Sequence, residues 1–193
     1  MITADKIKLF GMTHQMVERE LDQIEKRLGI DLQRTPRVQG VIDEDYYPQF
    51  EEAIRKEASS MAIHYQLFYC LEKSIRQLIS DKLRAEKGPN WWTSCVPEQI
   101  RKDSAENLQR EIDSGVTPRS TEEIDYITFG QLTEIAKNNW SSFEDTFNSQ
   151  KAFNKVMASL NVLRGPIAHC CVLAPDEITR LQVTVKDWFR LME

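Results

Sequence analysis

The sequence predicts an all-α protein: a bundle of four to five core helices with an N-terminal helical arm. Three observations predict this class. Apolar residues recur at steps of three and four along most of the chain, and no segment alternates with the period of two that marks a strand. The 193 residues include only 7 Gly and 7 Pro, too few for a turn-rich all-β protein. Hydrophobic residues make up 41% of the chain, which is enough to bury a core without disulfides or a structural metal.

The first 29 residues predict an amphipathic helix that ends at Gly29. Either this arm folds onto the core or it bridges two subunits, because three to four heptads support both interpretations. Residues 30–48 contain three turn-forming residues and an acidic run at 43–45, and they predict a connector. We therefore divide the chain into an N-terminal helix with its connector at 1–45 and a helical domain at 46–193. The heptad-like seam of the arm consists of Ile7, Phe10, His14, Val17, Leu21, Ile24 and Leu28.

A long helix is predicted for roughly residues 49–87, and a carboxylate interrupts its apolar seam. Glu72 falls in register with the seam, where an unpaired charge would be costly to bury. Arg76 follows four residues later, in the favourable acid-before-base order. Glu72 is therefore either half of a structural ion pair or a carboxylate of a functional site. The apolar members of the seam are Ile54, Ala58, Met61, Tyr65, Phe68, Ile75 and Ile79.

The second half of the chain predicts four more helices. Residues 88–90 end the long helix, and a loop then carries Trp91 and Trp92, which either pack with one ring inward and one outward or stack on bases. A polar helix is expected at 97–112. Thr128 to Gln131 has the capping-box pattern and opens a helix with an apolar stripe that reaches Phe147. The last two helices are expected at 150–163, with inward Phe153, Val156, Leu160 and Leu163, and at 175–192, with Ile178, Leu181, Val185, Trp188 and Met192.

Charge and cysteine content exclude several classes of function. The net charge of −5 disfavours extensive electrostatic coating of nucleic acid, although it leaves room for a local site. No stretch of 18 apolar residues and no signal-peptide pattern occur, so we expect a cytoplasmic protein without a membrane span. We expect Cys70, Cys95, Cys170 and Cys171 to be reduced and largely buried. Zinc at His169, Cys170 and Cys171 is a weak alternative, since adjacent ligands fit it poorly, and we expect no cofactor.

The segment between the last two helices contains the most reactive pair of residues. Gly165 precedes Pro166, a combination that disfavours helix and predicts a break. Arg164 and His169 would lie about 140° apart on an unbroken helix, at about 100° per residue. A break would let both side chains converge on one cleft. Histidine moves protons near neutral pH and arginine forks onto phosphate oxygens, so the pair suits phosphodiester chemistry.

Arg164 and His169 resemble the Arg-x-x-x-x-His signature of the HEPN superfamily of helical ribonuclease domains. Two further blocks, residues 125–132 (DYITFGQL) and 139–143 (NWSSF), resemble a particular HEPN branch. That branch occurs in bacterial proteins and at the C-terminus of a eukaryotic endoribonuclease of nuclear mRNA surveillance. The resemblance covers roughly residues 48–193.

The resemblance implies a HEPN-like homodimer whose two Arg/His motifs form one composite RNA site. It also implies metal-independent cleavage by attack of the ribose 2′-OH. On this basis His169 is the general base or acid, Arg164 stabilises the phosphoryl charge, and Glu72, supported by Arg76, orients the motif. Gly165 departs from the pattern, because many active members carry a polar residue, often Asn, directly after the motif arginine.

The leading hypothesis is an endoribonuclease that acts as a toxin or in phage defence, with a regulatory or antitoxin partner. The alternative is a non-catalytic HEPN dimer that binds RNA or a nucleotide, or that scaffolds a partner protein. Gly165 and the net charge of −5 favour this alternative. A third interpretation is a helical interaction protein that uses its N-terminal arm.

Overall fold

A computed structural model of the chain describes residues 21, 24, 27, 28 and 47–193. The predicted heptad seam, the connector and His14 lie almost wholly outside the described residues, so the two interpretations of the arm remain predictions. The division of the chain into 1–45 and 46–193 also stays a prediction. Residues 50–193 form one compact unit, which is described by itself below.

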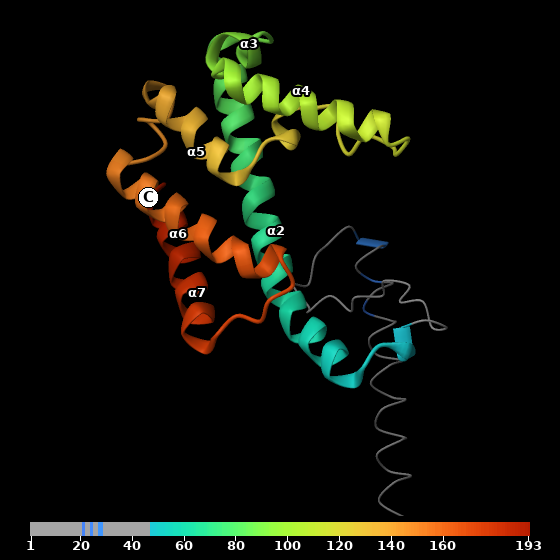
Figure 1. Ribbon diagram of the computed structural model, residues 1–193. Coiled ribbons are helices and arrows are strands. Elements are labelled where there is room, and N and C mark those ends of the chain that lie inside the picture. The colour runs from blue at the N-terminus through green and yellow to red at the C-terminus, as the bar shows by residue number, and fades with distance from the viewer. Residues whose placement is uncertain (1–20, 22–23, 25–26, 29–46) are drawn as a thin grey trace, which may run out of the picture. The chain divides into compact units, whose positions relative to one another are not determined.

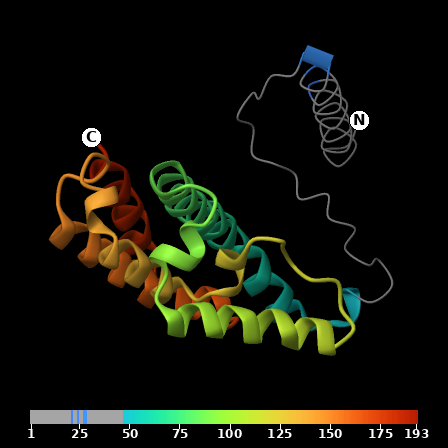
Figure 2. The ribbon, with the colours of Figure 1, turned by 90° about the horizontal axis from the view of Figure 1, so that it is seen from above.

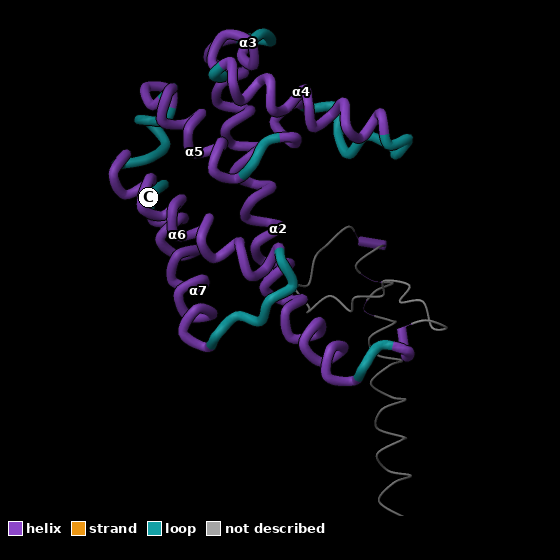
Figure 3. Tube along the Cα trace, in the orientation of Figure 1, coloured by secondary structure: helices purple, strands orange, loops and turns teal. Residues whose placement is uncertain are grey.

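The described part of the chain is helical, and Figure 3 shows no strand in it. A short 3-10 turn, η1 (Tyr47–Gln49), comes first. The all-α class predicted from the sequence is therefore confirmed. No helix among the described residues is long and apolar enough to cross a membrane. The remaining elements are α2 (Glu52–Lys87), α3 (Trp91–Cys95), α4 (Glu98–Asp113), η2 (Glu123–Tyr126), α5 (Phe129–Asn138), η3 (Trp140–Ser142), α6 (Gln150–Ala168) and α7 (Pro175–Arg190).

The core lies where the C-terminal half of α2 meets α3, α5 and α6, and α7 packs against α6. Helices α6 and α7 run side by side, and α4 lies away from α7 in both ribbon views (Figures 1 and 2). An aromatic cluster joins α6 to α7, with ring centroids 4.9 Å apart for Phe147 and Phe153 and 5.4 Å apart for Phe147 and Trp188. All four residues predicted to face inward from α6 are buried: Phe153, Val156, Leu160 and Leu163.

The apolar seam of α2 is buried only in its second half. The prediction that the whole seam packs into the core is wrong for Ile54 and Tyr65, which are 53% and 57% exposed. Full burial begins at Phe68 and continues through Ile75 and Ile79. The first turns of α2 extend past the other helices of the unit (Figure 1), so no described element covers them.

The predicted break at Gly165 and Pro166 is absent, because α6 continues through both residues to Ala168. Pro166 lacks the N–H that would bond to the carbonyl of Val162. Val162 is 73% exposed, so water can satisfy that carbonyl. The last turn keeps its other bonds, with the N–H of His169 donating to Gly165 O at 3.0 Å. A proline this close to the end of a helix therefore removes one backbone hydrogen bond but does not end the helix.

Helix α5 begins as predicted but ends earlier. Thr128 and Gln131 form the predicted capping box. The helix stops at Asn138, and the rest of the predicted stripe continues in a 3-10 turn and a loop. Asn139 explains the stop, since its side chain donates to Ile135 O at 2.8 Å and to Cys95 O at 3.0 Å. Phe143 and Phe147 beyond it are still buried.

Two predictions about burial were wrong. Trp91 and Trp92 lie in α3 rather than a loop, and they are only 3% and 8% exposed, with edge-to-face rings 5.4 Å apart. Both rings therefore belong to the core, and neither is available for stacking on a base. The four cysteines are free thiols as predicted, but they are not largely buried. Cys70, Cys170 and Cys171 are exposed, and Cys95 is half-buried.

Candidate functional site

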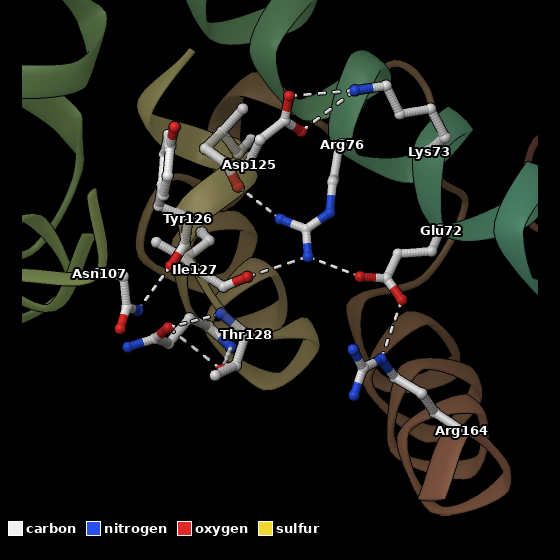
Figure 4. A network of polar contacts seen from close by, with 11 residues as sticks. Glu72, Lys73, Arg76, Asn107, Asp125, Tyr126, Ile127, Thr128 and Arg164 are labelled. Carbon is white, nitrogen blue, oxygen red and sulfur yellow. Dashed lines mark hydrogen bonds and ion pairs between the residues drawn. The ribbon is translucent and has the colours of Figure 1, made fainter. Parts of the chain in front are cut away.

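The site is organised around Arg76, a buried arginine on α2. Its guanidinium donates hydrogen bonds to the backbone oxygens of Ile124 and Ile127, the second at 2.9 Å (Figure 4). It also donates to Glu72 Oε1 at 2.6 Å. The two carbonyls belong to η2 and the residue that follows it. Arg76 is 8% exposed, and the two carbonyl oxygens and the Glu72 carboxylate satisfy its buried charge. Its position is therefore fixed.

Glu72 joins two arginines from distant parts of the chain. Its second oxygen, Oε2, accepts a hydrogen bond from Arg164 Nε at 3.0 Å (Figure 4). The side chain of Glu72 is 16% exposed, that of Arg76 10% and that of Arg164 37%. The predicted pair of Glu72 with Arg76 is therefore present, and the same carboxylate reaches α6. One anchored acid thus holds the motif arginine in place.

Arg164 keeps hydrogen-bonding capacity after this contact. Its Nε is bonded to Glu72, whereas neither terminal nitrogen makes a hydrogen bond to another residue in the described part of the chain. An arginine presents five N–H donors in a planar fork. The terminal N–H groups of Arg164 are accordingly available to an anion.

Arg164 lines a pocket of about 520 Å³ between α2, the η2 region and the end of α6. Four cationic and two anionic side chains line it, so the pocket is locally positive although the chain carries a net charge of −5. The apolar part of its wall includes three aromatic residues of α2. The charged residues are Glu72, Lys73, Arg76, Arg119, Asp125 and Arg164, and the aromatic ones are Tyr65, Phe68 and Tyr69.

Two further ion pairs fix the far wall of this pocket. Lys73 Nζ lies 3.1 Å from Asp125 Oδ2. Burial by itself would raise the pKa of the Asp125 carboxyl, but hydrogen bonds from Ser120 and Lys73, with the nearby cations, outweigh it and hold that pKa below its ordinary value. Arg119 pairs with Glu111, and its guanidinium lies 5.3 Å from the centre of the Tyr126 ring.

His169 does not share this pocket. It follows the last residue of α6, its side chain is exposed, and it is not among the residues that line the pocket around Arg164. The continuous helix removes the reason for expecting the two side chains to converge within one chain. At about 100° per residue, they leave α6 in directions about 140° apart.

Gly165 lies beside the site with open space around it. A Cβ added to this residue would meet nothing within 4 Å. Its φ is not in the left-handed region either, so neither packing nor backbone geometry requires glycine here. Among the described residues no group of three His, Cys, Asp or Glu side chains is arranged to hold a metal ion.

The family resemblance anticipated that Glu72 orients Arg164 or His169, but most of the pocket wall was not predicted. Lys73, Arg119 and Asp125 were not selected, although Asp125 begins one of the two blocks that resemble HEPN domains. Tyr65 belongs to the predicted seam, and Tyr69 has no predicted role. Their spacing of four, with Glu72 three residues after Tyr69, is the signal that could have placed both on the same face as the site.

Comparison with known protein families extends the resemblance seen in the sequence. The model of the Swt1-like HEPN family matches residues 66–193, which is more than half of the chain. That range includes Glu72, Arg76, Arg164 and His169. Comparisons with curated proteins and with solved structures give no significant match. The chain therefore belongs to the HEPN superfamily, in its Swt1-like family.

Proposed function

We propose that this chain is an endoribonuclease that cleaves RNA without a metal ion, through Arg164 and His169 at a homodimer interface. The bridge from Glu72 to Arg164 is the observation that carries the proposal. It anchors the motif arginine through Nε and leaves its terminal N–H groups to face a phosphate. Membership of the HEPN superfamily supports both RNA as the substrate and dimerisation.

The proposed reaction is an internal transesterification of RNA. His169 accepts the proton of a ribose 2′-OH, and the 2′ oxygen forms a bond to the adjacent phosphorus. The bond from phosphorus to the 5′ oxygen breaks, and that oxygen takes up a proton from water. The products are a 2′,3′-cyclic phosphate and a 5′-hydroxyl. Arg164 donates to the non-bridging phosphoryl oxygens, where negative charge builds in the transition state.

The separation of Arg164 from His169 favours a composite site. Within one chain the pocket is lined by Arg164 and not by His169. A site that uses both groups then takes them from two chains, as the family resemblance implies. Glu72 and Arg76 act as positioning residues in this scheme, since they fix Arg164 and do not touch the phosphate.

Cleavage of a single-stranded RNA in EDTA tests the proposal. The wild-type chain should yield ends with 2′,3′-cyclic phosphate and 5′-hydroxyl groups, and Arg164→Ala and His169→Ala should each lower the rate by about 10²-fold or more. Mixing the two inactive variants should restore activity, because a mixed dimer contains one intact Arg164/His169 combination. Arg180→Ala and His64→Ala remove an arginine and a histidine that do not line the pocket, so both control variants should cleave normally.

The result that overturns the proposal is equally specific. If the wild-type chain leaves varied RNAs intact while both variants bind RNA as well as it does, neither residue serves cleavage. If the mixed variants stay inactive although they form mixed dimers, the site is not shared between chains.

A second candidate function is a non-catalytic HEPN dimer that binds RNA or a nucleotide. The open space at Gly165 favours it, because a polar side chain would fit there and the chain has none. Saturable RNA binding without any product, measured alongside the oligomeric state by gel filtration, would support this binding function over the ribonuclease.

A further inference from the structure

We propose that the pocket beside Arg164 is a nucleobase subsite, in which a base next to the bound phosphate stacks on the tyrosines of α2. This inference deepens the proposed function and rests on it for the identity of the ligand as single-stranded RNA. It assigns a role to Tyr65 and Tyr69, which neither the ion-pair bridge nor the proposed reaction uses.

Two exposed aromatic rings line the pocket. Tyr65 and Tyr69 are 57% and 58% exposed, yet both line the pocket. They are four residues apart on α2, and their ring centroids lie 6.2 Å apart with planes inclined at 34°. Rings left this open form a stacking surface rather than part of the core, and base stacking on such rings does not depend on sequence.

The charged wall lies about one helical turn from Tyr69 and about two turns from Tyr65. Glu72 follows Tyr69 by three residues, so the two are about 4.5 Å apart along the helix axis. Glu72 holds Arg164, whose terminal N–H groups are available to a phosphate. A nucleotide could therefore place its phosphate on Arg164 and its base on Tyr69 at the same time.

The size and charge of the pocket fit a nucleotide of single-stranded RNA. Its volume of about 520 Å³ lies within the range of small-molecule sites. It combines a net positive lining with aromatic rings, the combination by which proteins bind single strands. Lys73 and Arg119 are the remaining cations of the wall, and each is held by a carboxylate that keeps its position fixed.

The burial of the tryptophans strengthens this assignment. Trp91 and Trp92 are in the core and cannot stack on a base. Phe189 on α7 is as exposed as Tyr65, at 57%, but it does not line the pocket. Tyr65 and Tyr69 thus differ from Phe189 in their position beside the pocket and not in their exposure. Phe189 therefore provides a matched control.

The experiment measures the dissociation constant of the full chain for a short 2′-O-methyl RNA, a probe that cannot be cleaved through its 2′ oxygen. Tyr69→Ala should weaken binding about 5- to 150-fold, the range for loss of one stacked base, and Tyr69→Phe should bind like the wild type. Phe189→Ala should also bind normally. A probe that lacks one base should bind wild type more weakly and remove the difference between wild type and Tyr69→Ala.

Three outcomes would overturn the subsite. The first is a Tyr69→Ala variant that binds the probe as well as wild type, and the second is a Tyr69→Phe variant that loses as much affinity as Tyr69→Ala. The third is a Tyr69→Ala variant whose oligomeric mass falls, because the ring would then belong to a protein interface. An unchanged melting temperature excludes misfolding as the cause of any loss.

Failure of the ribonuclease proposal gives a different pattern. If no RNA is cleaved but Tyr69→Ala still weakens binding of the probe, the subsite stands and the catalytic role falls. If RNA is cleaved and Tyr69→Ala changes neither binding nor rate, the catalytic role stands and the subsite falls.

Discussion

The two halves of α2 carry the same local pattern in opposite surroundings. Each half has a glutamate followed four residues later by a base: Glu52 with Lys56, and Glu72 with Arg76. Both pairs have N–O distances of 2.6 Å. The side chains of the first pair are 71% and 74% exposed, whereas those of the second are 16% and 10% exposed. The spacing predicts that each pair forms, and burial determines what the pair can do.

Burial changes the energetics of the ion pair because it changes which groups surround the two charges. Around Glu52 and Lys56, water solvates both charges and screens their attraction, so such a pair contributes little. Around Glu72 and Arg76, two backbone carbonyls and Arg164 replace water. Loss of one partner there leaves charges without solvation, so the same spacing supports a site in one half and only surface charge in the other.

The largest expected effect comes from truncating the seam itself. Ile75→Ala should destabilise the protein by about 2–5 kcal/mol, since Ile75 is fully buried and its loss leaves a cavity. Ile54→Ala, at the corresponding seam in the first half, should change stability by less than about 0.5 kcal/mol, because Ile54 is 53% exposed. Chemical denaturation of both variants checks the comparison. Equal losses would mean that the first half of α2 is covered in solution.

A smaller effect is expected from removing the acid of each pair. Glu72→Ala should cost about 1–3 kcal/mol, because it leaves part of the Arg76 guanidinium and the Arg164 Nε without their acceptor. Glu52→Ala should cost about 0.3–0.5 kcal/mol or less, and high salt should reduce even that. If cleavage occurs, Glu72→Ala should also lower its rate, while Glu72→Gln, which retains one acceptor oxygen, should restore part of it.

The pair at Glu72 also shows how far sequence reasoning extends. The spacing of Glu72 and Arg76 was sufficient to predict their contact, and the seam of α6 predicted which of its residues are buried. In the seam of the last helix, Leu181 and Trp188 are buried as predicted, whereas the prediction is wrong for Met192, which is exposed. The predictions that hold succeed because helical periodicity is local. The contact from Glu72 to Arg164 joins residues 92 positions apart, and spacing could not predict it. It was anticipated only as a family resemblance.

The predictions that failed concern residues whose tertiary environment, and not their local sequence pattern, determines the structure. The prediction of a break at Gly165 and Pro166 rests on the backbone hydrogen bond that proline cannot donate. Near the end of α6, water can replace that hydrogen bond. Tyr65 continues a seam that reads as core, yet no described element packs over it. The sequence specifies which face of a helix is apolar, whereas the tertiary arrangement decides whether that face is covered.

Another ion pair of α2, between Lys73 and Asp125, is intermediate in exposure and gives the smallest effect. The lysine side chain is 55% exposed and the aspartate side chain 16%. Because the pKa of Asp125 is lowered in the folded state, its charge stabilises the fold above the unfolded-state pKa of about 3.9. That contribution is lost as pH falls through the folded-state value. Asp125→Asn should therefore be less stable than wild type at about pH 7.

The difference between Asp125→Asn and wild type should shrink as pH falls from about 5 towards 3, because the wild-type carboxyl then becomes neutral as well. Urea unfolding across this range measures it. Asp81→Asn serves as the control on α2, the helix that carries Lys73, since Asp81 is exposed and accepts a hydrogen bond from Gln77. A constant difference at all pH values would show that the Asp125 side chain acts through hydrogen bonds alone. The pair with Lys73 would then resemble the exposed pair of Glu52 and Lys56 in its energetics, despite its position in the pocket wall.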